Sequence, residues 1–282
     1  DWTRTPTPAC VKAGWLISGS TIMNDIHPTA LVETGAELGE GVSIGPYSVI
    51  HAGARIGDEC RIGSHVTIVG QTSLGRAGRG HGGAVQGDPP QDLAFEERDS
   101  RLSIGERCVL REGVTAHRGT GEGTTTIGDD CYLMNHAHVG HNSRVGNQSI
   151  LASQVLLAGH VEIGDGVVFG GAVMVHQFCR VGRLCMLGGG CGVNKDVPPF
   201  TMTRSMALSE VVGLNVVGLR RAGFSAEDRI LLKRTLRTLY TSGLPLRKSA
   251  DELQARHPDG PARELADFVL ESQRGVCGFA GS

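Results

Sequence analysis

Histidine is the residue type in this sequence best suited to chemistry, and six of the 11 histidines fall between positions 117 and 176. Three of them, His136, His138 and His141, stand together in the stretch LMNHAHVGHNSRVG. A neutral imidazole can bind a metal ion or take up a proton near neutral pH. The cluster alone leaves three interpretations open: surface histidines, a zinc site that uses the pair His136 and His141, or an acid–base centre on His141.

A six-residue repeat must position this cluster. Every sixth residue is apolar from Ile26 to Leu74 and again from Ile127 to Val193, and a small residue usually stands four positions later. A period of six fits neither an α-helix nor an alternating strand. It is typical of a parallel β-helix, in which three hexads make an 18-residue coil with the apolar residues inside. The 42 glycines and only 4% aromatic residues agree with tight corners around a narrow core.

Residues 18 apart become vertical neighbours in such a coil, about 4.8 Å from each other. His141 is therefore expected beside Gly159, and Asn142 beside His160. A glycine N–H can approach an anion closely, as an oxyanion hole requires, although a tight corner also favours glycine. His117 lies beyond an irregular stretch and cannot be placed by counting.

The cysteines and the interruptions of the repeat can both be placed on the predicted β-helix. No C-x-x-C pair occurs, which argues against a zinc knuckle or a disulfide framework. Two interruptions, over residues 76–101 and 118–126, are expected to be loops that build a binding surface. The cysteines expected on the small inward site are Cys60, Cys108, Cys131, Cys179, Cys185 and Cys191.

Three segments are expected: an upstream extension over 1–22, a β-helix over 23–200 and a helical domain over 201–282. The two prolines in DVPPF end the repeat, and the spacing is interpreted as helical from Leu208 onward. Helices are predicted from the SAED cap at residue 225 to about Tyr240, then over 248–256 and 261–274. A basic face on the first of them is either solvated or a dock for an acidic partner, and consists of Arg229, Lys233 and Arg237.

Composition excludes some classes of function. The net charge of −2 does not favour nucleic acid binding. The sequence contains no run of about 18 apolar residues, so no membrane span is predicted. Residues 1–22 lack the features of a signal peptide, so the expected location is the cytoplasm.

The chain from about Ile26 to Arg274 resembles the UDP-N-acetylglucosamine O-acyltransferases that use acyl carrier protein and begin lipid A synthesis. Hexapeptide repeats occur in many transferases, whereas VHQFCRVG together with GLNVVGLRRAGF is far more specific. Other stretches that carry the resemblance are IHPTALVETGAELGEGVSIGPY, PPQDL, VTAHRGT, AHVGH, LLAGHVEIGD and DVPPF.

The resemblance implies a left-handed β-helix, a homotrimer with active sites between neighbouring prisms, and no cofactor or metal. It implies transfer of an (R)-3-hydroxyacyl chain from acyl carrier protein to the 3-hydroxyl of UDP-N-acetylglucosamine. His141 matches the general base, Gly159 the oxyanion donor, and Gly189 the position that limits acyl length. Positions matching residues that hold the nucleotide sugar or shape the pocket are Gln91, Asp92, His117, His138, His160, His176, Gln177, Asn215 and Arg221.

Four positions depart from the family pattern. Asn142 replaces an aspartate after the base histidine, Ala94 a lysine, Val217 a glutamate and Ala222 the second of two arginines. Because of these changes, fewer contacts with the sugar nucleotide are expected. They leave open an alternative function, that of a related N-acyltransferase acting on an amino-sugar nucleotide. The UDP-3-O-acylglucosamine N-acyltransferases also show HN at the positions that match His141 and Asn142. More distant alternatives are a zinc hydratase similar to γ-class carbonic anhydrases and a non-catalytic scaffold.

Overall fold

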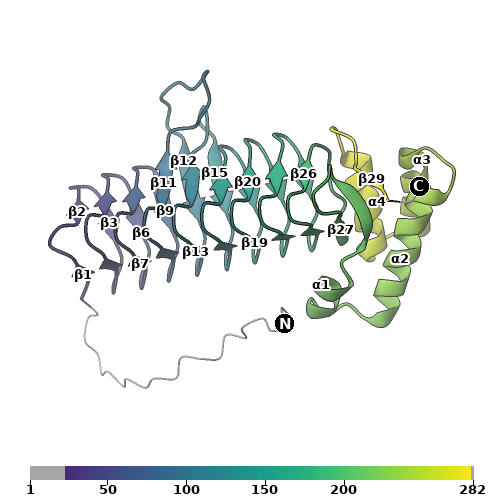
Figure 1. Cartoon of the computed structure of the whole chain (residues 1–282), viewed down its shortest axis with the longest axis horizontal. Coiled ribbons are helices and arrows are strands. Elements are labelled where there is room, and N and C mark those ends of the chain that lie inside the picture. The colour runs from purple at the N-terminus through teal and green to yellow at the C-terminus, as the bar shows by residue number, and fades with distance from the viewer. Residues whose placement is uncertain (1–22, 281–282) are drawn as a thin grey trace.

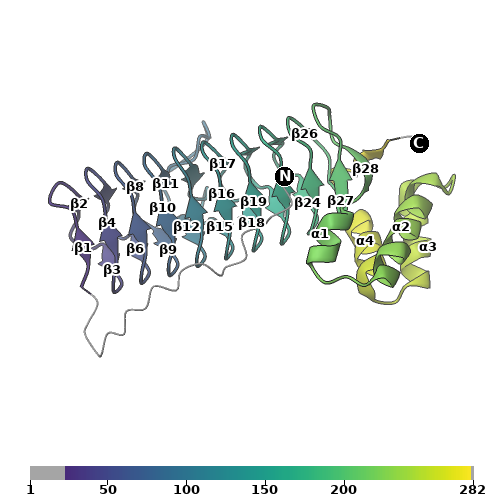
Figure 2. The ribbon, with the colours of Figure 1, turned by 60° about the horizontal axis from the view of Figure 1, so that its bottom comes forward.

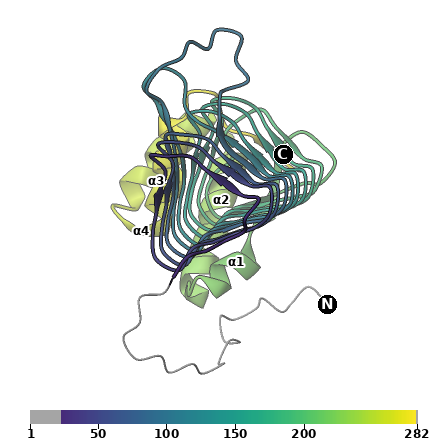
Figure 3. The ribbon, with the colours of Figure 1, turned by 90° about the vertical axis from the view of Figure 1, so that its left-hand side faces the viewer.

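The computed structural model describes residues 23–280, so the extension predicted over residues 1–22 lies outside the described residues. Short strands wind into a long triangular prism with helices at one end (Figures 1 and 2). The view along the axis in Figure 3 shows the three flat faces, here called A, B and C in the order in which the chain visits them. The prediction of a parallel β-helix is confirmed.

Each face is one sheet with strands from successive coils side by side. Face A contains β1 (Asp25–Ile26), β4 (Ser43–Ile44), β7 (Arg61–Ile62), β10 (Arg79–Gly80), β13 (Val109–Leu110), β16 (Tyr132–Leu133), β19 (Ile150–Leu151), β22 (Val168–Phe169), β25 (Met186–Leu187), β27 (Thr201–Thr203), β28 (Glu210–Leu214) and β29 (Gly278–Phe279). Face B contains β2 (Leu31–Val32), β5 (Val49–Ile50), β8 (Thr67–Ile68), β11 (Val85–Asp88), β14 (Thr115–His117), β17 (His138–Val139), β20 (Leu156–Leu157), β23 (Met174–Val175) and β26 (Gly192–Val193). Face C contains β3 (Glu37–Leu38), β6 (Arg55–Ile56), β9 (Thr72–Leu74), β12 (Arg101–Ile104), β15 (Thr124–Ile127), β18 (Arg144–Val145), β21 (Glu162–Ile163) and β24 (Arg180–Val181).

The inward residues of the repeat form the core. Leu133, Leu151 and Leu157 are fully buried, and the small inward residue Ala137 is equally inaccessible. The predicted stacking interval is confirmed, because Leu133 pairs with Leu151, 18 residues later. All six cysteines predicted on the small inward site are buried and unoxidised. A buried thiol behaves here as a small apolar filler.

The corners between faces follow one backbone template. At the edge between faces C and A, each corner usually begins with a glycine, because a side chain there strikes the next coil. A Cβ atom at Gly146 would lie 2.6 Å from the backbone N of Asp165. The third corner residue adopts a positive φ, as Gln148 does at 56°. This conformation is uncommon for residues other than glycine, and the stacked coils enforce it.

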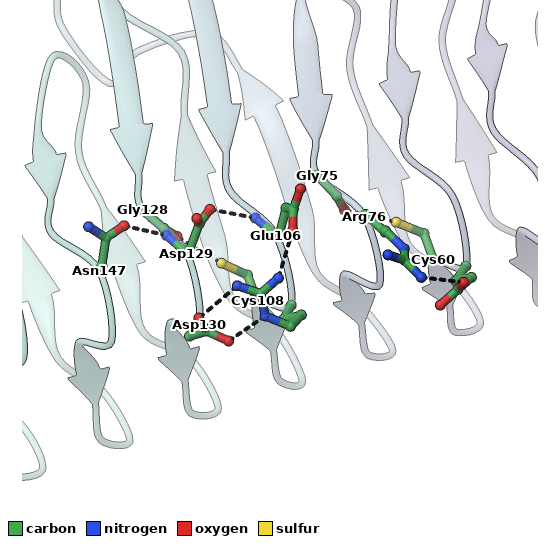
Figure 4. A network of polar contacts seen from close by, with 11 residues as sticks. Cys60, Gly75, Arg76, Glu106, Cys108, Gly128, Asp129, Asp130 and Asn147 are labelled. Carbon is green, nitrogen blue, oxygen red and sulfur yellow. Dashed lines mark hydrogen bonds and ion pairs between the residues drawn. The ribbon is translucent and has the colours of Figure 1, made fainter. Parts of the chain in front are cut away.

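Side chains at the C–A edge bind the backbone of the neighbouring coil. The Asp129 carboxylate accepts the N–H of Glu106 at 2.8 Å, and the Asn147 side-chain oxygen accepts the N–H of Asp129 at 2.8 Å (Figure 4). One coil further, Asp165 accepts the N–H of Asn147 at 2.7 Å. These bonds form a ladder along the edge that satisfies corner N–H groups.

The predicted interruption over residues 76–101 is too long. Strands β10 and β11 continue the coil inside it, and only residues 89–100 leave the prism as a loop (Figure 1). Counting an apolar residue at every sixth position missed these two strands, because Gly80 and Gln86 occupy their inward positions. The Gln86 amide crosses the core and fills the space that Gly80 leaves, since a Cβ atom at Gly80 would lie 3.2 Å from Gln86 Nε2. The second interruption is also shorter than predicted, because β15 begins at Thr124.

The chain after the last coil forms strands and helices. Helical spacing predicted from Leu208 is wrong, because β28 pairs antiparallel with β27 and completes face A. The helices are α1 (Val216–Arg221), α2 (Ala226–Thr241), α3 (Leu246–Arg256) and α4 (Gly260–Glu271), so the three predicted helices are confirmed and α1 was missed. Ser225 and Asp228 form the predicted cap of α2. Helix α4 joins the prism through Arg183, which donates two hydrogen bonds to Glu264 at 2.7 and 2.8 Å.

Candidate active site

The predicted histidines gather at the edge between faces B and C. The corners at residues 140–143, 158–161 and 176–179 stack there, and the loops 89–100 and 118–123 leave the prism at the same edge (Figure 3). The third residue of each corner again has positive φ: 58° for Asn142, 57° for His160 and 65° for Phe178. The backbone template is that of the C–A edge, while its side chains are different.

His141 and Gly159 are in direct contact, as the 18-residue interval predicted. The N–H of His160 donates to the carbonyl of His141 at 2.9 Å and joins the two corners. A Cβ atom at Gly159 would lie 2.5 Å from both Cε1 and Nε2 of the imidazole. The ring therefore lies over the bare backbone of the glycine. Within residues 23–280, the Gly159 N–H has no hydrogen-bond acceptor.

Asn142 decides which nitrogen of His141 carries the proton. Its Oδ1 accepts the backbone N–H of Thr120 at 2.8 Å and lies 2.9 Å from Nδ1 of His141. A backbone N–H can only donate, so the atom facing Thr120 must be the amide oxygen, and Nδ1 of His141 must then be the donor. Nε2 is left with its lone pair beside Gly159 and can act as a base.

Loop 118–123 encloses Asn142 from outside. The Thr120 hydroxyl also donates to Asn142 Oδ1 at 2.9 Å, and the Asn142 N–H donates to the Thr125 hydroxyl at 2.8 Å. A side chain at Gly123 has no space, because its Cβ would lie 2.1 Å from Asn142 Nδ2. The departure from the family aspartate is therefore a fully engaged, neutral hydrogen-bond acceptor.

Two further histidines lie next to His141, and burial disfavours the charged form of both. The rings of His117 and His138 meet edge to face with centroids 4.8 Å apart. Burial lowers the pKa of His138 to about 4, and burial likewise lowers the pKa of His117. The Thr115 hydroxyl lies 2.8 Å from His138 Nδ1. Neutral rings here avoid placing extra positive charge beside the base.

His160 lies on the other side of His141. Its ring meets that of His141 at 90°, with centroids 5.2 Å apart, and stacks on Phe178 at 4.8 Å. Burial lowers the pKa of His160, and the nearby carboxylate of Asp92 opposes this shift. Asp92 comes from loop 89–100, so the loop brings a carboxylate to the histidine cluster.

A cleft of about 720 Å³ opens on face B beside this edge. Its polar wall includes Gln91, His138 and His176, and its floor carries the exposed apolar side chains Leu156 and Met174. An apolar groove that ends at a polar cluster suits a ligand with a hydrocarbon chain and a polar reacting end.

Three predicted site residues lie elsewhere in the protomer. Asn215 caps α1 by accepting the Gly218 N–H at 2.9 Å, and its amide donates to Leu184 at the C–A edge. Arg221 is the last residue of α1, which Figure 3 shows away from the loop-bearing edge. Gly189 lies at the A–B edge and does not line the cleft on face B. Gln177 is exposed at the B–C edge, between Gly159 and the helical end.

Several site residues were missed. Thr120 lies inside the irregular loop 118–123 and Thr125 lies in β15 directly after it, so counting by sixes could not place either residue. Phe178 was available from the sequence, since it follows His160 by 18 residues.

The histidine pair behind the zinc interpretation is separated. His136 is exposed at the A–B edge, whereas His141 lies at the B–C edge. Within residues 23–280, no group of three or more His, Cys, Asp or Glu side chains is placed to hold a metal ion. The same range contains no helix long and apolar enough to cross a membrane.

Comparisons with known proteins decide the family. Residues 196–277 match the model of domain 2 of UDP N-acetylglucosamine O-acyltransferase, and residues 35–70 and 124–159 match the bacterial transferase hexapeptide model. The acyl-[acyl-carrier-protein]–UDP-N-acetylglucosamine O-acyltransferase of Halorhodospira halophila is 43% identical over 258 residues, 90% of this chain and 99% of the relative. This chain belongs to the UDP-N-acetylglucosamine O-acyltransferase family.

Other members agree in sequence and in structure. The Syntrophobacter fumaroxidans relative of the same name is 40% identical over 89% of this chain and 98% of its own. The UDP-N-acetylglucosamine acyltransferase structure from Francisella novicida superposes with a TM-score of 0.87 at 32% identity, covering 91% of this chain and 95% of the other. The Campylobacter jejuni structure gives 0.85 at 34% identity, over 90% and 99% of the two chains. The family predicted from the sequence motifs is confirmed.

Proposed function

We propose that this protein transfers an (R)-3-hydroxyacyl chain from acyl carrier protein to the 3-hydroxyl of UDP-N-acetylglucosamine, the reaction that begins lipid A synthesis. Membership in the O-acyltransferase family supports the activity. The observation that carries the mechanism is the contact between the imidazole of His141 and the bare backbone of Gly159. Acyl transfer from a thioester needs a base for the hydroxyl and a donor for the oxyanion, and this contact brings both groups together.

The proposed mechanism has two steps. His141 Nε2 removes the proton of the sugar 3-hydroxyl as the oxygen attacks the thioester carbonyl carbon. The carbonyl oxygen becomes an oxyanion and accepts the Gly159 N–H. The intermediate then collapses, the carbon–sulfur bond breaks, and the imidazolium returns its proton to the departing thiolate.

The other residues are proposed to bind substrate. His117, His138 and His160 surround the base, while Gln91, Asp92, His176 and Gln177 line the approach to it. Gly189 is proposed to limit acyl length by leaving space at the A–B edge. No cofactor or metal takes part in this scheme.

A homotrimer is part of the proposal. Asn215 and Arg221 lie at a different prism edge from His141, so a site that uses them with the base needs a neighbouring copy. Light scattering tests this, and a mass near that of one 29.7 kDa chain contradicts it.

Helix α2 is proposed as the dock for acyl carrier protein. Lys233 and Arg237 are exposed on one face, while Arg229 turns its guanidinium to the carbonyl of Phe224. Two exposed cations suit an acidic carrier. Since acyl carrier protein and nucleotide sugars are made in the cytoplasm, we place the reaction there.

A sister N-acyltransferase is the second candidate, and Asn142 favours it. The neutral amide orients His141 but cannot stabilise its charged form as a carboxylate does. An amine acceptor depends less on the base than a hydroxyl does. One assay separates the two: the purified protein with UDP-N-acetylglucosamine or its 3-amino analogue, and a series of 3-hydroxyacyl carrier proteins. Turnover with the amine alone contradicts the O-acyltransferase proposal.

A further inference from the structure

Loop 89–100 carries two of the proposed substrate-binding residues, so its anchoring matters. The loop follows β11, whose register shifts at Gly87, where φ is 86° and a Cβ atom would meet Thr72 Oγ1. Its own bonds are local, such as the Ala94 N–H donating to the Asp92 carboxylate at 2.9 Å. Among the described residues, every hydrogen bond that joins residues 91–98 to a residue outside loop 89–100 goes to Arg118.

Arg118 contacts the loop in three ways. Its guanidinium makes two contacts of 2.7 Å with the Glu97 carboxylate, and Nη1 donates to the carbonyl of Arg98 at 3.4 Å. The same group lies 5.4 Å from the centre of the Phe95 ring. Its backbone N–H donates to Asp88 at 3.2 Å, at the end of β11. One residue thus joins the middle of the loop, through its side chain, to the base of the loop, through its backbone.

The two partners differ in exposure. The side chain of Arg118 is only 8% exposed, whereas that of Glu97 is 71% exposed. A buried guanidinium is always charged and needs a carboxylate to compensate its lost hydration. The bidentate geometry restricts the direction from which Glu97 approaches. The loop is therefore drawn toward a fixed point on the prism.

We propose that Arg118 is a positioning residue of the transfer reaction, whose ion pair with Glu97 holds loop 89–100 over the B–C edge. In this position Gln91 lines the cleft, and the Asp92 carboxylate acts electrostatically on His160. The inference rests on the proposed function, because it assumes that Gln91 and Asp92 bind the sugar nucleotide. Arg118 touches neither the base nor the reacting atoms and acts through the loop.

The test uses two neighbouring glutamates of the same loop. Glu97→Gln removes the partner of Arg118 and keeps its size. Glu96→Gln is the matched control, because Glu96 is also exposed and pairs with an arginine, Arg98, at 2.7 Å, but does not contact Arg118. We expect Glu97→Gln to raise KM for UDP-N-acetylglucosamine about tenfold with kcat within about twofold, as loss of uniform binding does. The control is expected to leave both values unchanged.

Thermolysin nicking of the substrate-free protein measures the loop directly. The protease cleaves on the amino side of Leu93 and Phe95, and neither substitution alters these sites. We expect Glu97→Gln to speed cleavage several-fold over the control, since cleavage follows the open population of a segment. Arg118→Gln is expected to match it, and the double variant to be no worse than either single variant.

Equal behaviour of Glu97→Gln and Glu96→Gln in both assays overturns the proposal, as do additive effects in the double variant. The two measurements also separate the inference from the function. A parent protein that does not turn over UDP-N-acetylglucosamine removes the proposed function, and the nicking rates then still decide whether Arg118 holds the loop.

Discussion

The B–C and C–A edges of the prism have the same backbone and opposite uses of their side chains. At the C–A edge, Asn147 and Asp165 accept N–H groups from the preceding coil and contribute to the fold. At the B–C edge, His141 and Asn142 bind each other, Asn142 also binds loop 118–123, and the Gly159 N–H has no acceptor in the described chain. The corner template thus tolerates polar side chains that bind the neighbouring coil as well as polar side chains that bind a loop. Their partners determine whether an edge stabilises the fold or provides a site.

The largest difference between the edges is expected from removing the base. His141→Ala should lower the transfer rate by about 10³-fold or more, because the hydroxyl loses its proton acceptor. The free energy of unfolding should change by less than about 1 kcal/mol, since the side chain is only half buried. Asn147→Ala at the C–A edge should do the reverse, losing about 1 kcal/mol with unchanged activity. Rates from a carrier-release assay and urea unfolding check both, and normal turnover in His141→Ala removes the base from the mechanism.

The next largest difference between the edges is expected from replacing a corner glycine by alanine, at Gly159 or at Gly146. A Cβ atom at Gly159 meets the imidazole of His141, a side chain that can move away. We expect Gly159→Ala to fold but to lose about 10²-fold in kcat, as when an oxyanion donor is disturbed. At Gly146 the Cβ meets the backbone of Asp165, which cannot move. Gly146→Ala should therefore cost about 2 kcal/mol or more of stability. Calorimetry and kcat measured on both variants decide, and a fully active Gly159→Ala would contradict the tight pairing.

The two edges should respond to acid in different pH windows. The folded pKa of His138 is about 4, below its unfolded value of about 6.5, so folding disfavours its protonation. The contribution of neutral His138 to the free energy of unfolding is complete above about pH 6.5. It is lost as the pH falls toward 4, by up to about 3 kcal/mol. Arg107 at the C–A edge holds the pKa of Asp130 below its usual range, so that contribution is lost only below about pH 4.

Urea unfolding between pH 7 and 4 measures this difference. His138→Gln should flatten the decline, although His117 and His160, whose pKa values are also lowered by burial, contribute in the same window. Asp130→Asn should leave the slope above pH 4 unchanged. An NMR titration in which the His138 ring protonates near pH 6.5 would show that its environment is not the one described.

The smallest expected effect comes from charge beside the base. Asn142→Asp keeps the acceptor for His141 Nδ1 and Thr120 and adds a carboxylate that stabilises the imidazolium. We expect the rate with a hydroxyl acceptor to rise by up to about tenfold. Asn147→Asp is the matched change at the C–A edge and should leave the rate unchanged. A fall in rate for Asn142→Asp would indicate that loop 118–123 is arranged for the neutral amide.

The sequence determined the prism and much of the site. A strict period of six admits one architecture, and stacking at 18 residues placed His141 beside Gly159 without any coordinates. Counting failed where the inward residue was not apolar, at Gly80 and Gln86, because the two residues fill one space together and neither follows the pattern alone.

Only the tertiary structure decided the partners of the base. Loops 89–100 and 118–123 have no period, so the contacts of loop 118–123 with Asn142 and of loop 89–100 with Arg118 follow from the shape of the edge to which the loops return. The proton position on His141 was likewise decided by a single backbone N–H, that of Thr120. A repeat fixes residues at regular intervals, whereas a hydrogen-bonded loop closes on whichever groups its length and the neighbouring coils bring within about 3 Å.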